Sequence, residues 1–399
     1  MTLTRRSWLA SIAGARLAPR AHRAFESEAA VSPPGRADLP LRDFQPVSSL
    51  HVAETPIERP RFPVIDVHTH LTDAVRAVKG VPMGESRAVL APPSALLSVM
   101  DRRGIQTMVN LTGGWDAGLR ASVDLFDRAH PGRFVTFTEP SWERVPESSY
   151  PRWQAEAIER AHRDGARGVK VLKTLGLYLR QRVTDGTLVT VDDARFDPLW
   201  ETCAGLRMPV AIHVGDPEAF FRPIDRYNER YEELANHPDW SFHGRDYPSQ
   251  RALLDALDRV IGRHPRTEFI GLHVGNAAED LGFVSASLDR HPNLSVELGA
   301  RIGELGRQPR ASARFFDRHQ DRILFGTDAT PNAPDVPQQT FGDALYRIYF
   351  RFLETADEYF DYAPAAVPPQ GRWRIYGLGL DEGVLRKVYH DNAARLLGL

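Results

Sequence analysis

The sequence predicts a (β/α)8 barrel, and three observations support that prediction. After residue 61, short apolar runs alternate eight times with longer helical patterns. Most of these runs are continuous rather than alternating, as expected of parallel strands that are covered on both faces. The first run ends in Asp66-Val67-His68-Thr69-His70 and lacks the glycine-rich phosphate loop of a doubly wound open sheet, which is the alternative fold. Residues 62–399 are long enough for the eight strand–helix units of a barrel.

Each strand is expected where β-branched and aromatic residues cluster, and each helix where apolar residues recur at helical spacing over a longer stretch. In chain order, the expected strands are residues 62–67, 107–111, 134–138, 168–172, 209–213, 268–273, 294–298 and 322–325. The expected helices are residues 93–103, 117–130, 151–164, 194–207, 249–264, 277–291 and 308–319.

Two long connections and a helical C-terminal extension complete the expected barrel. Residues 215–249 follow the fifth strand, and residues 330–380 follow the eighth. Active sites of such barrels lie at the carboxyl ends of the strands, so both segments are expected to cover that face as lids or specificity loops.

Charge and composition limit the classes of protein that this sequence can represent. The 399 residues include 50 Lys plus Arg against 52 Asp plus Glu, which gives a formal net charge of −2. That balance argues against a nucleic-acid-binding protein, because such a protein usually carries a concentrated basic excess. The single cysteine, Cys203, excludes an internal disulfide, and no apolar run approaches the roughly 18 residues of a membrane-spanning helix. The expected partner is a small-molecule substrate.

Two segments precede the expected barrel. Residues 1–25 place Arg5 and Arg6 before a short apolar run, which resembles a twin-arginine export signal. A flexible basic tail is the alternative, so a periplasmic and a cytoplasmic location both stay open. Residues 26–61 are rich in proline, which favours extended backbone, and are expected to form an arm.

Histidines recur at the expected carboxyl ends of the strands. His68 and His70 are two residues apart, so in a strand their imidazoles point to the same face. His213 ends the fifth strand, His273 ends the sixth, and Asp328 follows the eighth. Four imidazoles and a carboxylate at the mouth of one barrel predict a site for a divalent cation such as Zn²⁺, Mn²⁺ or Co²⁺.

The order of these residues resembles the amidohydrolase superfamily. The resemblance rests on Asp-Val-His-Thr-His, on the strand-end histidines and on Phe-Gly-Thr-Asp. The closing Asn-Ala-Ala-Arg-Leu-Leu is similar to the last helix of the branch that contains aminocarboxymuconate semialdehyde decarboxylase, resorcylate-type decarboxylases and pyrone dicarboxylate hydrolases. The resemblance implies one divalent metal ion, zinc before manganese or cobalt, and an assembly that can be a homodimer. It implies His68, His70, His213 and Asp328 as metal ligands and His273 as a catalytic histidine beside the metal.

Lys173, at the end of the fourth expected strand, has two interpretations. In other branches of the superfamily a carboxylated lysine at the equivalent position bridges two metals, which implies a dinuclear site as the alternative. Otherwise Lys173 is a charged side chain that pairs with an anionic substrate, together with Arg180. Lys170 lies an odd number of residues earlier, so a regular strand would direct it to the opposite face.

These residues predict a metal-dependent hydrolase of a small, carboxylate-bearing lactone, amide or related substrate. A metal-activated water attacks, Asp328 accepts a proton, and His273 polarises the carbonyl or protonates the leaving group. A metal-dependent decarboxylase of a small aromatic or unsaturated acid is the alternative, and a metal-containing binding protein without turnover is the third. Substrate contacts are expected from the loop after the fifth strand and from the barrel mouth, at Arg226, Tyr227, Arg230 and Asn276. Asp66 and Glu297 are further polar residues near the expected metal site.

Overall fold

The structure is a computed structural model that describes residues 38–244 and 246–399. The chain divides into two units, residues 1–49 and residues 50–399. The described part of the first unit contains one 3₁₀ helix, η1 (Leu41–Asp43), with extended backbone after it. The expected export signal at residues 1–25 lies outside the described residues.

The second unit contains eight short parallel strands that are central to the fold. They are β1 (Val64–Thr69), β6 (Ile105–Asn110), β7 (Phe134–Thr136), β8 (Val169–Val171), β9 (Val210–Ile212), β10 (Phe269–Gly271), β11 (Leu294–Glu297) and β12 (Ile323–Leu324). Hydrogen bonds join β1, β6 and β7 in one sheet and β8 to β12 in a second, always between strands that follow one another in this series.

Contacts between the two sheets complete the barrel. On one side, Thr138 after β7 forms a parallel bridge with Val169 of β8. On the other side, the N–H of Val67 in β1 donates to the carbonyl of Phe325 after β12 at 3.0 Å. The eight strands therefore follow one another around a ring in chain order, and the predicted (β/α)8 fold is confirmed.

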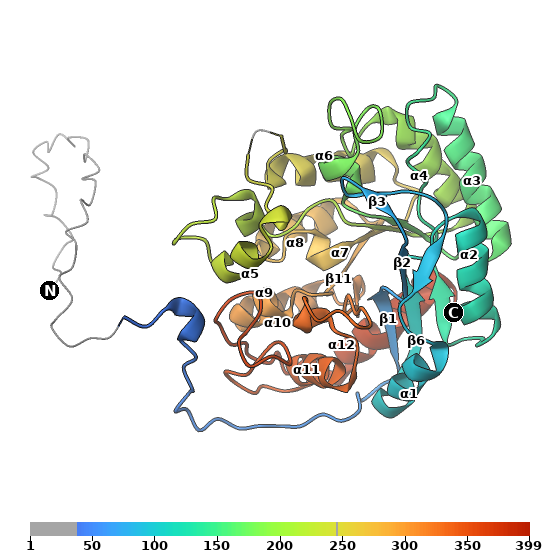
Figure 1. Ribbon diagram of the computed structural model, residues 1–399. Coiled ribbons are helices and arrows are strands. Elements are labelled where there is room, and N and C mark those ends of the chain that lie inside the picture. Colours follow the sequence, from blue (N-terminus) through green and yellow to red (C-terminus); the bar gives the residue numbers. More distant parts are fainter. Residues whose placement is uncertain (1–37, 245) are drawn as a thin grey trace, which may run out of the picture. The chain divides into compact units, whose positions relative to one another are not determined.

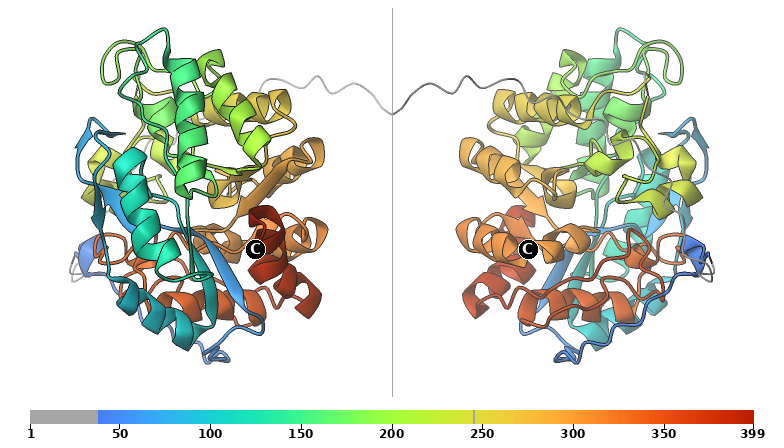
Figure 2. Two further views of the ribbon diagram at one scale, coloured as in Figure 1. Left: turned by 90° about the vertical axis from the view of Figure 1, so that its right-hand side faces the viewer. Right: turned by 90° about the vertical axis from the view of Figure 1, so that its left-hand side faces the viewer.

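Helices surround the strands, as Figures 1 and 2 show. The longer ones are α1 (Pro93–Arg103), α2 (Asp116–Val123), α3 (Tyr150–Asp164), α4 (Asp197–Leu206), α6 (Gln250–Arg263), α8 (Leu281–Arg290), α10 (Pro309–Arg318) and α11 (Asp343–Glu354). The first seven match the expected helices within a few residues, except that α2 ends at Val123 and a π-helical segment, η2 (Asp124–Arg128), continues it toward the expected end at residue 130. The chain closes with α12 (Glu382–Arg386), a π-helical segment η8 (Lys387–Asp391) and α13 (Asn392–Leu397), which form the expected C-terminal extension.

Burial explains why the strands read as continuous apolar runs. Inward-facing Ile65, Val67 and Val109 belong to a cluster inside the barrel, and Val64 and Met108 belong to a larger cluster between the strands and the helices. Both faces of each strand are therefore covered, so polar residues inside these runs need a specific partner.

The segments at the carboxyl ends of the strands are more elaborate than expected. After β1 the chain forms two small antiparallel pairs, β2 (Thr72–Ala74) with β5 (Arg87–Val89) and β3 (Ala77–Val78) with β4 (Val81–Pro82). These pairs were not predicted, because their strands are only two or three residues long and lack an apolar run. The loop after β9 contains no strand, as expected, but it folds into η5 (Glu218–Phe221), α5 (Tyr231–Asn236) and η6 (Pro238–Trp240).

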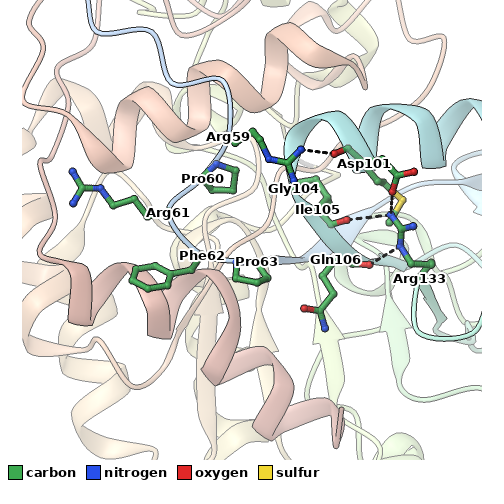
Figure 3. Close-up of a pocket in the computed structure, with 11 residues that line it drawn as sticks. Arg59, Pro60, Arg61, Phe62, Pro63, Asp101, Gly104, Ile105, Gln106 and Arg133 are labelled. Atoms are coloured by element: carbon green, nitrogen blue, oxygen red, sulfur yellow. Dashed lines mark hydrogen bonds and ion pairs between the residues drawn. The ribbon is translucent and has the colours of Figure 1, made fainter.

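A hollow of about 440 Å³ lies at the amino ends of β1, β6 and β7 (Figure 3). Arg59 crosses there and donates to the carbonyl of Asp101 at the end of α1, and Arg133 donates to the Asp101 carboxylate at 2.8 Å. Gly104 ends α1 with φ 71°, and a side chain there would contact Pro60. This end of the barrel is therefore stabilised by arginine contacts to backbone and carboxylate oxygens.

No helix in the described part of the chain is both long and apolar enough to cross a lipid bilayer.

Candidate active site

The candidate site occupies the carboxyl ends of the strands. His68 lies on β1 and His70 directly after it, His213 follows β9, His273 follows β10, and Asp328 follows β12. Four of these five side chains line a cavity of about 360 Å³, and His68 lies fully buried beneath it. The structure thus brings together all five residues that the sequence singled out.

Asp328 is the point at which the histidines converge. Its Oδ1 atom lies 3.0 Å from Nε2 of His68 and 3.0 Å from Nε2 of His70. Ligand atoms of His68, His273 and Asp328 also lie within 4.8 Å of one another. Two atoms that each bind one metal at about 2.1 Å are separated by about 3–3.4 Å, so this spacing fits a shared cation.

Glu297 at the end of β11 orients two of the histidines. Its Oε1 atom accepts from Nδ1 of His68 at 3.0 Å and from the backbone N–H of His273 at 2.6 Å. Nδ1 of His273 lies 2.8 Å from the carbonyl of Gly299, which can only accept, so this nitrogen carries the proton. Both imidazoles are thereby oriented with Nε2 on the opposite side of the ring, facing the other site residues, and a metal ligand or base uses this nitrogen without its proton.

The backbone is strained where the site residues lie. His273 has φ 54°, Val274 has φ 58° and Asp328 has φ 62°, and none of them is a glycine. Such left-handed conformations are unfavourable for side-chain-bearing residues, above all β-branched ones, and cluster where function requires a particular geometry. The turns after β10 and β12 thus direct His273 and Asp328 to the cavity at an energetic cost.

Asp66 supports the site from below. Its carboxylate accepts from the Thr327 hydroxyl at 2.6 Å, from the Tyr346 hydroxyl at 3.0 Å and from the His68 backbone N–H at 3.2 Å. Burial raises the pKa of Asp66 to about 7 despite these hydrogen bonds. The residue links β1 to the turn that carries Asp328.

The charges around Asp328 favour its ionised form. The same surroundings shift the pKa values of His68 and His213 in opposite directions. Burial alone would raise the pKa of Asp328, but the charge and hydrogen bond of His68 hold it well below its usual value. Burial would lower the pKa of His68, but the Asp328 and Glu297 carboxylates raise it. Burial lowers the pKa of His213 to about 4, and its Nε2 atom has no hydrogen-bond partner among the described residues.

The two lysines of the fourth unit occupy unexpected positions. Lys170 lies within β8, is buried, and its Nζ atom is 3.3 Å from Nε2 of His68. Lys173 lies beyond the strand with a helical backbone conformation, and its Nζ atom donates to Asp216 at 2.6 Å. The expectation that Lys170 faces away was wrong, because β8 ends at Val171 and the two-residue alternation does not extend to Lys173.

The other expected contact residues are distributed unevenly. Arg230 lines the cavity, but its guanidinium is buried between Glu233 and Glu304. Asn276 is buried and accepts the N–H of Val214 at 2.9 Å, so it supports the turn after β9. The structure does not bring the remaining three into the cavity: Arg180 donates to the carbonyl of Gly186, and Arg226 and Tyr227 contact each other on the exposed part of the loop.

Several polar residues of the cavity were not predicted from the sequence, among them Asp216, Arg301 and Gln339. Asp216 accepts Lys173, Arg301 follows β11, and Gln339 of the 3₁₀ helix η7 (Pro337–Gln339) donates to Asp328. Asp216 and Arg301 each lie a few residues past a strand end, the same place as the histidines, and that position is a signal that could have identified them. Gln339 arrives from a long connection and carries no comparable signal.

The fold and this cluster define the class of protein. It is a (β/α)8 barrel with histidines and an aspartate gathered at the carboxyl ends of its strands, as in metal-dependent barrel enzymes. The sequence profile of the amidohydrolase family matches residues 65–399, so the chain belongs to the amidohydrolase family. The predicted resemblance is thereby confirmed.

Solved structures with the same fold have low sequence identity to this chain. A 2,6-dihydroxybenzoate decarboxylase in complex with 2,6-dihydroxybenzoate is 16% identical with a TM-score of 0.50, over 85% of this chain and 100% of that chain. The 2,6-dihydroxybenzoate decarboxylase from Rhizobium is 17% identical with a TM-score of 0.49, over 84% and 99%. A probable 2-pyrone-4,6-dicarboxylic acid hydrolase from Acinetobacter baumannii is 9% identical with a TM-score of 0.48, over 85% and 100%. None of the curated proteins compared matches this chain.

Proposed function

We propose that this protein is a metal-dependent hydrolase that cleaves a C–O or C–N bond of a small, carboxylate-bearing lactone, amide or related substrate. The observation that carries the proposal is the convergence of His68 and His70 on one oxygen of Asp328, at 3.0 Å each. The cavity above them, about 360 Å³, is at the small end of the range for ligand sites.

One divalent ion, zinc before manganese or cobalt, would be held by His68, His70, His213 and Asp328. Three neutral nitrogens and one carboxylate form a donor set that suits Zn²⁺. When bound, the ion would lower the pKa of a water molecule and polarise a substrate carbonyl. The unpartnered Nε2 atom of buried His213 is a donor that such an ion would satisfy.

His273 is the residue to which we assign proton transfer. Its Nδ1 atom is committed to the Gly299 carbonyl, and burial holds its pKa well below the usual value, so Nε2 is a free base. His273 would accept a proton from the attacking water and then return it to the leaving group. Asp328, whose pKa is held well below its usual value, remains an ionised ligand.

The contacts of Lys173 favour one metal rather than two. Lys173 lies beyond the end of β8, and its Nζ atom forms an ion pair with Asp216 at 2.6 Å. A dinuclear site bridged by a modified Lys173 would require this ion pair to break. We therefore assign Lys173 to the anion-binding part of the cavity.

A metal-dependent decarboxylase is the second candidate, and Lys170 is the observation that favours it. A decarboxylase must deliver a proton to carbon as CO₂ leaves, and the buried Lys170 ammonium lies 3.3 Å from His68 at the floor of the site. Burial lowers its pKa to about 8, so it still carries a proton near pH 7. Two of the structures with this fold are 2,6-dihydroxybenzoate decarboxylases.

A product assay separates the two candidates. The full chain, loaded with zinc, is incubated with a panel of carboxylate-bearing lactones and amides and with hydroxybenzoic acids. We expect acid release, measured by titration at constant pH, without CO₂ release, and loss of that activity in Asp328→Ala. Release of CO₂ from a hydroxybenzoic acid, with no hydrolysis of any lactone or amide, would instead establish the decarboxylase.

A further inference from the structure

Arg301 is a buried cation that faces the cavity and has no role in the proposed reaction. It directly precedes α9 (Ile302–Arg307) as its N-cap residue, and only 7% of it is exposed. The turn before α9 is held in place because Ala300, with φ 55°, donates its N–H to the buried Tyr349 hydroxyl at 2.9 Å. The guanidinium is thereby fixed in the lining of the cavity rather than free in solvent.

The charges around Arg301 are already committed to other partners. Lys173 donates to Asp216 at 2.6 Å, and Arg230 donates to Glu233 at 2.6 Å and to Glu304. The nearest described carboxylate oxygen to Arg301 belongs to Asp216 and is 3.8 Å from its NH2 atom, which is too far for a hydrogen bond. Its hydrogen bond to the described part of the chain goes to the adjacent Ala300 carbonyl.

A guanidinium in this state is poised for an anion. Five N–H donors in a planar fork match the two oxygens of a carboxylate, and a buried arginine without such a partner is costly. The neighbouring Asp216 lies between Arg301 and the metal-type site, with Oδ1 3.5 Å from Nε2 of His213. A carboxylate bound by Arg301 would therefore lie next to the reacting group of the same small molecule.

We propose that Arg301 binds a carboxylate of the substrate beside the histidine cluster. This inference rests on the proposed function of the site, which it deepens by naming the substrate class as small carboxylic acids anchored through that group. An ion pair with Arg301 stabilises a charged carboxylate more than the neutral CO₂ that decarboxylation would form from it. The carboxylate that Arg301 binds is therefore not the group that reacts. Bond cleavage then occurs at the other end of the molecule, as in hydrolysis.

Benzoate and its neutral counterpart benzamide provide a direct test that needs no turnover. Their affinities for the full chain are measured by isothermal titration calorimetry, with the protein as purified and again after treatment with a chelator. We expect benzoate to bind with a Kd below about 1 mM, at least tenfold tighter than benzamide, and to do so in both preparations. Benzoate binding that persists after chelator treatment would show that the anion contacts the cationic side chains of the protein and not the metal ion.

Variants then locate the anion. Arg301→Gln is expected to weaken benzoate binding at least tenfold and leave benzamide unchanged, while Arg301→Lys loses less, because it keeps the charge but not the fork. Arg226→Gln, at an exposed arginine outside the cavity, is the matched control and should bind benzoate like the unaltered chain.

Three results would overturn the proposal: no benzoate binding up to about 10 mM, equal affinity for benzamide in the unaltered chain, or unchanged benzoate affinity in Arg301→Gln. The comparison of benzoate with benzamide does not depend on how the variants fold. Failure of hydrolysis with intact, Arg301-dependent benzoate binding would reject the hydrolase and keep the anchor. If Arg301→Gln hydrolyses the substrate as well as the unaltered chain does, the hydrolase would be kept and the role of Arg301 as the anchor would be rejected.

Discussion

Replacement of Glu297 by glutamine tests how the metal-type site is held together. The side chain is fully buried, and every partner it has is a donor: Nδ1 of His68, the N–H of His273 and the N–H of Gly299. Glutamine keeps the shape but has a single acceptor oxygen and an NH2 group. In either orientation of the amide, its NH2 group faces at least one of these N–H donors and cannot accept from it.

The size of the effect follows from these contacts. If the amide oxygen stays with His68 and His273, the NH2 group opposes the Gly299 N–H, and a hydrogen bond to a charged acceptor is lost. Such a bond contributes about 1.5–3 kcal/mol, so we expect the free energy of unfolding to fall by about 3 kcal/mol. The carboxylate also increases the basicity of His68, and its loss should weaken metal binding by about 10- to 100-fold.

The assay measures both quantities on the same protein. Zinc affinity is determined by competition with a chromophoric chelator, and stability by urea unfolding without metal. Glu304→Gln is the matched control, because Glu304 is also buried at this end of the barrel but pairs with Arg230 and not with a histidine. It should lose stability and keep its zinc affinity. A Glu297→Gln variant that binds zinc within threefold of the unaltered chain would refute the reasoning.

Three further predictions follow from the same contacts. Because the pKa of His68 is raised above its unfolded value, its contribution to the stability of metal-free protein is present below about pH 6.5. That contribution is lost as pH rises through the folded pKa; urea unfolding at pH 6 and pH 9 should show this decline, and saturating zinc should remove it. Gly326→Ala should lower the thermal midpoint by several degrees, since its Cβ would clash with Oε2 of Glu297, whereas Gly205→Ala, in open space on α4, should not. Burial lowers the pKa of Lys170 from 10.5 to about 8, so Lys170→Met should raise stability at pH 7 by up to about 3 kcal/mol and flatten its rise between pH 8 and pH 10.5, measured by urea unfolding.

The barrel could be predicted because both faces of its strands are covered. Continuous runs such as the one around Val109 and the one around Ile270 leave few other structures that would bury them. The small pairs β2–β5 and β3–β4 could not be predicted in the same way. Their strands are two or three residues long, so pairing depends on the turn geometry between them rather than on an apolar pattern.

The site could be predicted where a polar residue interrupts a buried run, as His68 and His273 do. Partners that come from elsewhere in the chain were not predictable, because contacts such as Glu297 with His68 or Tyr349 with Ala300 depend on the closed barrel. The position of Lys170 shows a third limit. A face assignment by alternation holds only within the strand, and the end of β8 at Val171 could not be read from the sequence.

Metal stoichiometry tests the central claim most directly. The full chain is purified without added metal, loaded with zinc, dialysed against metal-free buffer and measured by inductively coupled plasma mass spectrometry, beside His68→Ala. We predict that the unaltered chain retains one zinc ion per chain and that His68→Ala retains less than one tenth of that amount. No retained zinc, two ions per chain, or equal zinc in His68→Ala would contradict it.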